Sequence, residues 1–162
     1  MATTVNGMAA KENDDTPWSQ EEFAAYYGDI KRVGNVVIGR RTFEIVKNSE
    51  EEMSRIKDIV AVVVSHQKID DEHFISVTSP QEALQNLTEK GFSEAIIGGG
   101  GELNASFLKE GLIDEMIIDV EPMVFGKGIP LFAPGDFDAT LKLLSTQKLN
   151  ANTVRLRYQV IR

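Results

Sequence analysis

The stretch that decides the fold reads Ala95-Ile96-Ile97-Gly98-Gly99-Gly100-Gly101-Glu102-Leu103. Its apolar start predicts a strand that ends at the glycines, and a helix is expected from about Glu102 to Lys109. Consecutive glycines cost conformational entropy on folding, so a simple turn would ordinarily contain only one or two. Without side chains, the backbone amides lie open to a ligand, and the helix N-terminus adds about half a positive charge. The stretch therefore predicts a strand–turn–helix unit that binds a pyrophosphate, with a flexible turn as the alternative.

A second strand ends in the same way within residues 37–43, which read VIGRRTF. Gly39 ends the strand, and the following helix is expected to carry Arg40, Arg41 and Thr42 in its first turn. The helix dipole disfavours cations at that position. Their presence suggests an anion between the arginines and the first amides, whereas solvated surface arginines are the alternative.

A third strand, Asp58–Ser65, is apolar on both faces and is followed by His66 and Gln67. Such a strand is typical of a parallel sheet that helices cover on both sides. Polar groups just past the carboxyl end of a buried parallel strand lie where α/β folds bind ligands. Ser65 and His66 are therefore candidate ligand contacts, and an ordinary loop histidine is the alternative for His66.

Strands that alternate with helices along the chain predict the fold class. We expect an α/β three-layer sandwich with a central, mainly parallel mixed sheet. Thr140–Lys148 and Thr153–Ile161 alternate apolar and polar residues around a turn, which predicts a C-terminal antiparallel hairpin. The chain has 162 residues, and we find no linker, so a single domain over residues 1–162 is expected.

Composition and charge exclude several functions. The net charge is −8 and the pI is near 4.8, so the chain would repel a nucleic acid backbone. There is no cysteine, and the histidines are only His66 and His73, so no thiolate or His-rich metal site is expected. No apolar run reaches transmembrane length, and the first residues lack the pattern of a signal peptide. A cytoplasmic protein with no membrane partner is expected.

The first helix is predicted from a capping box at residues 19–22, which read SQEE. In such a box Ser19 accepts a hydrogen bond from the amide of Glu22, and the Glu22 carboxylate reaches back to the amide of Ser19. Apolar and aromatic side chains follow at helical spacing on one face, and they include Phe23, Tyr26 and Tyr27.

The three strand ends, with LIDEMIIDVEP at 112–122 and FGKGIPLF at 125–132, make the chain resemble dihydrofolate reductase over nearly its whole length. The run GGGGELNASFLKEGLIDE at 98–115 resembles even more the related reductase domain of riboflavin biosynthesis. The resemblance implies the fold of that superfamily, NADPH as cofactor and a small heterocyclic substrate. It also implies that the segment Asn6–Trp18 closes over the nicotinamide.

The resemblance assigns the cofactor residues. It implies that the glycine run contacts the pyrophosphate and nicotinamide of NADPH, with a cis peptide bond at Gly99-Gly100. Its G-R-x-T pattern implies adenosine phosphates near Arg40, and it implies the 2′-phosphate near Ser65 and His66. The candidate cofactor residues are Gly39, Arg40, Arg41, Thr42, Ser65, His66, Ile97, Gly98, Gly99, Gly100, Gly101, Glu102 and Leu103.

The resemblance also implies a substrate carboxylate early in the helix after Trp18. Alignment by the helix cap assigns this role to Glu22, whereas an ungapped count places Phe23 there. Asp29, Asp14 and Asp15 are further candidates. The candidate catalytic residues are Glu22 and Trp18. The candidate substrate-binding residues are Phe23, Tyr26, Tyr27, Arg55 and Lys57.

The leading interpretation is NADPH-dependent reduction of dihydrofolate, or a related pterin, by a monomer or homodimer. The alternative enzyme reduces the ribosyl-aminopyrimidine of riboflavin biosynthesis, whose phosphate requires a second basic pocket. The cations outside the cofactor motifs are scattered along the sequence, and they are Lys31, Arg32, Arg55, Lys57 and Lys127. A non-catalytic NADPH-binding module is the third possibility, from a different class of protein.

Overall fold

The computed structural model describes residues 1–162 as two compact units. Unit 1 comprises Met1–Tyr26 and Asn104–Arg162, and unit 2 comprises Tyr27–Leu103. Helices α1 (Gln20–Val33) and α5 (Gly101–Lys109) each begin in one unit and end in the other. The expectation that residues 1–162 form a single domain therefore remains a prediction.

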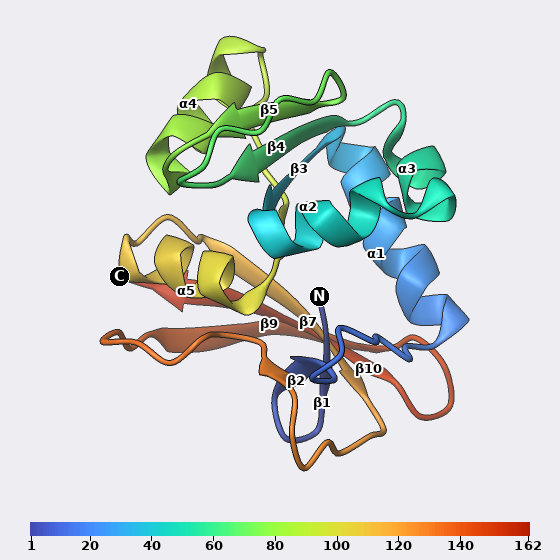
Figure 1. Cartoon of the computed structure of the whole chain (residues 1–162). Coiled ribbons are helices and arrows are strands. Elements are labelled where there is room, and N and C mark those ends of the chain that lie inside the picture. Colours follow the sequence, from blue (N-terminus) through green and yellow to red (C-terminus); the bar gives the residue numbers. More distant parts are fainter. The chain divides into compact units, whose positions relative to one another are not determined.

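Unit 2 is built on a parallel four-stranded sheet in the order β5-β4-β3-β6. Its strands are β3 (Asn35–Gly39), β4 (Val60–Val64), β5 (Phe74–Val77) and β6 (Ile97–Gly99). Val62 and Val63 of β4 are fully buried, as a strand covered on both faces must be. Figure 1 shows helix α4 (Pro80–Glu89) on one side of β4 and α2 (Arg40–Lys47) on the other. The connection from β3 through α2 to β4 and the connection from β5 through α4 to β6 run in opposite directions across the sheet. Because such connections are right-handed, their helices lie on opposite faces.

Serine side chains cap the N-termini of two helices in unit 2. Ser79 caps α4 by accepting a hydrogen bond from the amide of Glu82 at 3.2 Å, and Pro80 follows at the first helical position. Helix α3 (Glu50–Ile56) has its own cap, because Ser49 accepts from the amide of Glu52 at 3.3 Å.

Asn35, which is fully buried at the start of β3, fixes the position of β6. Its Nδ2 donates to the carbonyl of Glu94 at 2.8 Å, and its Oδ1 accepts from the amide of Ile96 at 3.2 Å. These bonds hold the segment that leads into β6 beside β3. The strand was expected to end before the glycines, but β6 includes Gly98 and Gly99. The bonds from Asn35 align the chain with β3, so that the pairing between the strands extends to Gly99.

Unit 1 contains a mixed four-stranded sheet in the order β1-β7-β10-β9. Strand β1 (Ala2–Thr4) is parallel to β7 (Glu115–Glu121), and β10 (Val154–Ile161) is antiparallel to both β7 and β9 (Thr140–Lys148). The expected C-terminal hairpin is therefore confirmed, and Figure 1 shows its two long strands in orange and red. Strand β9 is exposed along its whole length, including Leu143 and Leu144.

A further pairing in unit 1 joins β2 (Met8–Ala10) to β8 (Ile129–Pro130). No strand was predicted from the sequence in either segment. A Cβ atom at Gly128 would lie 2.5 Å from the carbonyl oxygen of Ala10, so only glycine allows the two chains to come this close.

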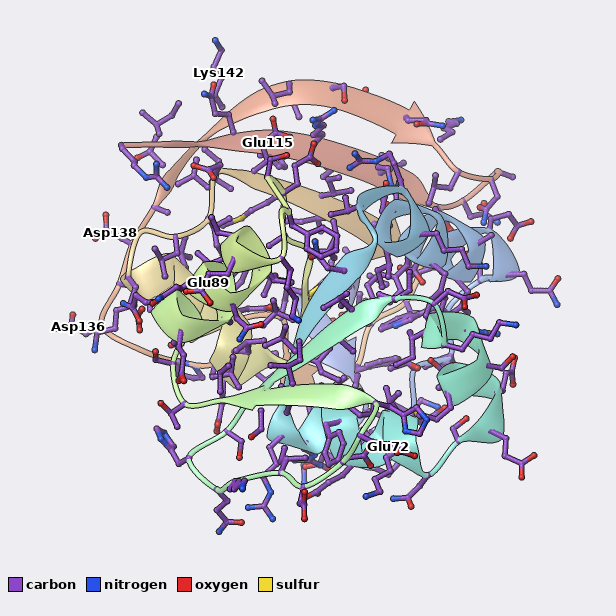
Figure 2. All side chains as sticks on the ribbon, turned by 90° about the horizontal axis from the view of Figure 1, so that it is seen from above. Glu72, Glu89, Glu115, Asp136, Asp138 and Lys142 are labelled. Carbon is purple, nitrogen blue, oxygen red and sulfur yellow. The ribbon has the colours of Figure 1, made fainter.

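The α/β class with mainly parallel strands in unit 2 is confirmed, and the chain's strands form two four-stranded sheets and one two-stranded ribbon. The acidic surplus faces solvent. Exposed acidic side chains that Figure 2 labels are Glu72, Glu89, Glu115, Asp136 and Asp138.

Candidate functional site

The three motifs predicted to bind the cofactor meet at one edge of the sheet in unit 2. Gly39 pairs with Val64, so Ser65, the next residue, follows the end of β4 beside the start of α2. Ile38 pairs with Gly99, so the glycine turn follows β6 on the other side of β3. The carboxyl ends of parallel strands are where α/β folds bind ligands. The sheet thus gathers residues that lie far apart in the sequence.

The glycine turn packs closely against the start of α2. The peptide bond between Gly99 and Gly100 is cis, as expected. Gly99 has a φ angle of +95°, which L side chains rarely adopt. A Cβ atom at Gly39 would lie 3.7 Å from the carbonyl oxygen of Gly99, and one at Gly100 would lie 3.8 Å from Oγ1 of Thr42. The end of β3 at Gly39, the glycine turn and the Thr42 hydroxyl therefore lie close together.

The N-terminus of α2 has no acidic partner of its own. Gly39 caps the helix without a side-chain hydrogen bond, and the first turn contains no acidic residue. Arg40 is exposed, its Nε donates to Glu44 at 2.9 Å, and its Nη1 donates to Gln67. The hydroxyl of Ser65 accepts from the amide of Gln67 at 3.1 Å. Arg40 thus lies beside the loop after β4, where the sequence predicted an anion.

The remaining predicted cofactor residues divide by exposure. Arg41, His66 and Glu102 are exposed, whereas Ile97 is half-buried. The buried members of the set are Gly98, Gly101 and Leu103.

Unit 1 contains a buried acidic cluster formed by Glu22 of α1 and by Asp119 and Glu121 of β7. Glu22 and Glu121 are each 2% exposed, and Asp119 is fully buried. Asp119 accepts two hydrogen bonds from Arg155, at 2.7 and 2.8 Å. Glu121 accepts from Ser19 and from the hydroxyl of Thr153.

The capping box at the start of α1 forms only in part. The amide of Glu22 donates to the hydroxyl of Ser19 at 3.2 Å, as predicted. The amide of Ser19 donates to Oε1 of Glu121 at 3.3 Å, where the sequence predicted the Glu22 carboxylate. That expectation was wrong because β7 brings a second glutamate to the same amide.

Burial raises the pKa of Glu22 from 4.5 to about 7. The amino group of Met1 opposes this increase, Asp119 and Glu121 add to it, and Arg155 opposes it. A carboxyl group with a pKa near 7 can hold or release a proton at neutral pH, which suits a general acid.

The other predicted substrate residues lie in separate surroundings. Trp18 stacks on Phe125 with ring centroids 6.0 Å apart. Arg55 lies over the ring of Tyr27 at 4.8 Å and pairs with Glu51 and Glu52 of its own helix, so its charge is already balanced. The hydroxyl of Tyr27 donates to Glu52. Lys57 is exposed, and Phe23 and Tyr26 are half-buried.

Sequence reasoning missed Asp119, Glu121 and Arg155. A signal was present, because Asp119 and Glu121 follow the apolar residues of the strand within LIDEMIIDVEP. A charged residue in such a strand is seldom buried unless it is paired.

The fold and the sheet-edge site define a protein of the dihydrofolate reductase superfamily. The model of the family described as "RibD C-terminal domain" matches residues 1–154. The chain therefore belongs to the RibD C-terminal domain family, whose members in riboflavin biosynthesis are reductases. This assignment favours the riboflavin alternative over dihydrofolate reduction.

The chain is also similar to individual proteins and to solved structures. The chain is 34% identical to the Bacillus subtilis protein YwjB over 98% of this chain and 94% of that protein. A pyrimidine reductase-like protein from Corynebacterium diphtheriae has a TM-score of 0.79 at 14% identity, over 99% of this chain and 90% of the other. A diaminohydroxyphosphoribosylaminopyrimidine deaminase/5-amino-6-(5-phosphoribosylamino)uracil reductase from Thermotoga maritima has a TM-score of 0.74 at 16% identity, over 99% of this chain and 55% of the other. None of the helices has the length and apolar character needed to cross a membrane.

Proposed function

We propose that this protein is an NADPH-dependent reductase of an aminopyrimidine or a related heterocycle. The observation that carries the proposal is the meeting of three strand ends, after β3, β4 and β6, at one edge of the sheet in unit 2. Family membership supports a reductase, and the sheet edge supplies the residues that a dinucleotide phosphate requires.

The residues at this edge fit NADPH. Gly39 and the glycine turn lie close together and have no side chains, which suits the close approach of a pyrophosphate to backbone amides. Gly39 provides no side-chain cap for α2, and the N-terminus of a helix favours an anion. Arg40 and Ser65 are expected to hold the 2′-phosphate, since a guanidinium and a hydroxyl both donate to phosphate oxygens.

When bound, the cofactor supplies a hydride for the substrate. The chain's own contribution is to hold the phosphates at the edge of unit 2 and to supply a proton from a side chain. We assign that proton to Glu22 of unit 1, because it is a buried carboxyl group with a pKa of about 7.

The family and two similar solved structures support our choice of substrate class. The Thermotoga relative is named for reduction of 5-amino-6-(5-phosphoribosylamino)uracil, and the Corynebacterium relative is described as pyrimidine reductase-like. We place a phosphoribosylamino-pyrimidine first. Lys127, which the sequence analysis considered for the substrate phosphate, lines a groove with Lys11 and Phe125 in unit 1. Dihydrofolate is the second candidate, because a buried carboxyl group also suits the amidine edge of a pterin.

The experiment compares both substrates in one assay. Oxidation of NADPH is followed by its absorbance after addition of 5-amino-6-(5-phosphoribosylamino)uracil or dihydrofolate. Faster oxidation with the pyrimidine supports the proposal, and faster oxidation with dihydrofolate reverses the order of the two substrates. Binding of NADPH without oxidation by either substrate would favour a non-catalytic module.

A further inference from the structure

We infer that Glu121 is a positioning residue that takes the place of Glu22 in the capping box and thereby leaves the Glu22 carboxyl group free for the substrate. The inference rests on the proposed function, in which Glu22 supplies the proton. It concerns Glu121, a residue that the proposed function does not use.

The hydrogen bonds at the start of α1 show the replacement. Oε1 of Glu121 accepts from the hydroxyl of Ser19 at 2.7 Å and from the amide of Ser19 at 3.3 Å. The Ser19 hydroxyl in turn accepts from the amide of Glu22 at 3.2 Å. A capping box needs a carboxylate at the first amide. Here the carboxylate comes from β7, so the helix is capped without the side chain of Glu22.

Glu121 is itself held firmly in this place. Its Oε2 accepts from the hydroxyl of Thr153 at 3.2 Å, so both of its oxygens have donors. Thr153 is fixed by the turn before β10, because its amide donates to Oδ1 of Asn150 at 2.8 Å. Glu121 also pairs with Thr4 in the parallel ladder of β1 and β7.

A second serine–glutamate box in the same chain shows the opposite arrangement. At the start of α4 the amide of Glu82 donates to Ser79 at 3.2 Å. The Glu82 carboxylate accepts from the amide and hydroxyl of Thr78 at 2.7 and 2.8 Å. These bonds hold the pKa of Glu82 below its ordinary value. The exposed Glu82 is therefore kept ionised by the bonds at its own helix start, whereas burial raises the pKa of Glu22.

The charges that face Glu22 come from the N-terminus and from two strands. They are the amino group of Met1, Asp119 and Glu121 on β7, and Arg155 on β10. Asp119 is paired with Arg155, whereas Glu121 is bound by the neutral donors of Ser19 and Thr153. Loss of the charge at Glu121 should therefore favour ionisation of Glu22. Protonated Glu22 can pass its proton to the substrate heteroatom that receives the electron pair displaced by the hydride, become a carboxylate and regain a proton from water.

The test measures the titration of Glu22 in the free protein by NMR of its labelled carboxyl carbon, assigned with Glu22→Gln. Glu121→Gln keeps an acceptor for Ser19 but removes the charge, and it should lower the pKa of Glu22 by about one unit. Glu121→Ala leaves the Ser19 amide open to Glu22, which should lower that pKa further. In both variants the activity at high pH should decline and the pH optimum should move downward, with the KM for NADPH unchanged. Asp136→Asn, which removes an exposed charge of the same unit, should leave the titration as it is.

An unchanged Glu22 titration in both variants would overturn the inference, and Glu121→Gln alone decides the matter if Glu121→Ala does not fold. A shifted titration of Glu22, together with normal turnover of Glu22→Gln, would support the role of Glu121 in the helix cap. The same result would show that Glu22 is not the acid. Failure of the proposed function is thus distinguishable from failure of this inference.

Discussion

Arg155 of β10 lies directly opposite Asp119 of β7 and donates two hydrogen bonds to its carboxylate. Nε reaches Oδ1 at 2.7 Å and Nη2 reaches Oδ2 at 2.8 Å. The Asp119 side chain is completely buried, and that of Arg155 is 16% exposed. The planar guanidinium therefore satisfies a carboxylate that water does not reach.

Arg155→Leu should lower the free energy of unfolding by about 3–5 kcal/mol, because it leaves the charge of Asp119 buried and unpaired. Urea denaturation measures the change. Arg157→Leu is the matched control, since Arg157 lies on the same strand and pairs with Glu115 on the surface, so its loss should cost less than about 1 kcal/mol. Equal losses in the two variants would show that Asp119 does not depend on Arg155.

Stability should depend on pH through Glu22. Its pKa is about 7 in the folded chain and near 4.5 when unfolded, so the folded state holds a proton that the unfolded state has released. Stability should therefore decline by about 3 kcal/mol as pH rises from about 4.5 to above 7. Glu22→Gln should remove this decline, whereas Glu89→Gln, at an exposed position, should keep it. Parallel stability curves for Glu22→Gln and the unmodified protein would contradict the raised pKa.

Glu22→Gln should reduce turnover at least about a hundredfold, the usual effect of losing a general acid. The variant keeps the backbone amide that donates to Ser19, so the cap of α1 should survive. Steady-state kinetics of NADPH oxidation measures the effect, and Glu21→Gln, at the exposed neighbouring position, is the control. Near-normal turnover would remove Glu22 from the mechanism and direct attention to Asp29.

Gly99→Val should abolish NADPH binding, because a side chain would enter the glycine turn and the φ angle of +95° would be strained. Gly91→Val is a matched control, since Gly91 has a φ angle of +88° and open space around it. Both variants should lose about 1–3 kcal/mol of stability, but only Gly99→Val should lose the cofactor. Calorimetric titration with NADPH measures binding. Normal binding by Gly99→Val would show that the glycine run is a simple turn with no role in cofactor binding.

Arg40→Ala should weaken NADPH binding at least about tenfold and leave NADH binding little changed, because a charge-assisted bond to the 2′-phosphate is worth about 1.5–3 kcal/mol. Michaelis constants for the two cofactors measure this preference. Arg32→Ala, which removes an exposed arginine paired with Glu94, should change neither constant. If the unmodified protein bound NADH and NADPH equally well, the proposed 2′-phosphate contact would be wrong.

The sequence by itself determined the features that depend on near neighbours. The apolar run of β4 and the glycines at 98–101 predicted two of the strands in unit 2, because burial and backbone freedom are properties of the residues themselves. The glycines did not give the end of β6, which includes Gly98 and Gly99. The cap of α4 by Ser79 is local in the same way, since a helix cap joins residues three apart. The alternation of β9 and β10 was sufficient to predict the hairpin.

Only the tertiary structure decided which partner each polar group takes. Ser19 and Glu22 have the same spacing as Ser79 and Glu82, but Glu121 occupies the Ser19 amide because pairing within the sheet brings it there. The β2–β8 ribbon and the Asp119–Arg155 pair also join distant segments of the chain. Local periodicity reports which face of an element is buried, whereas hydrogen-bond partners far apart in the chain are fixed only when the strands find their register.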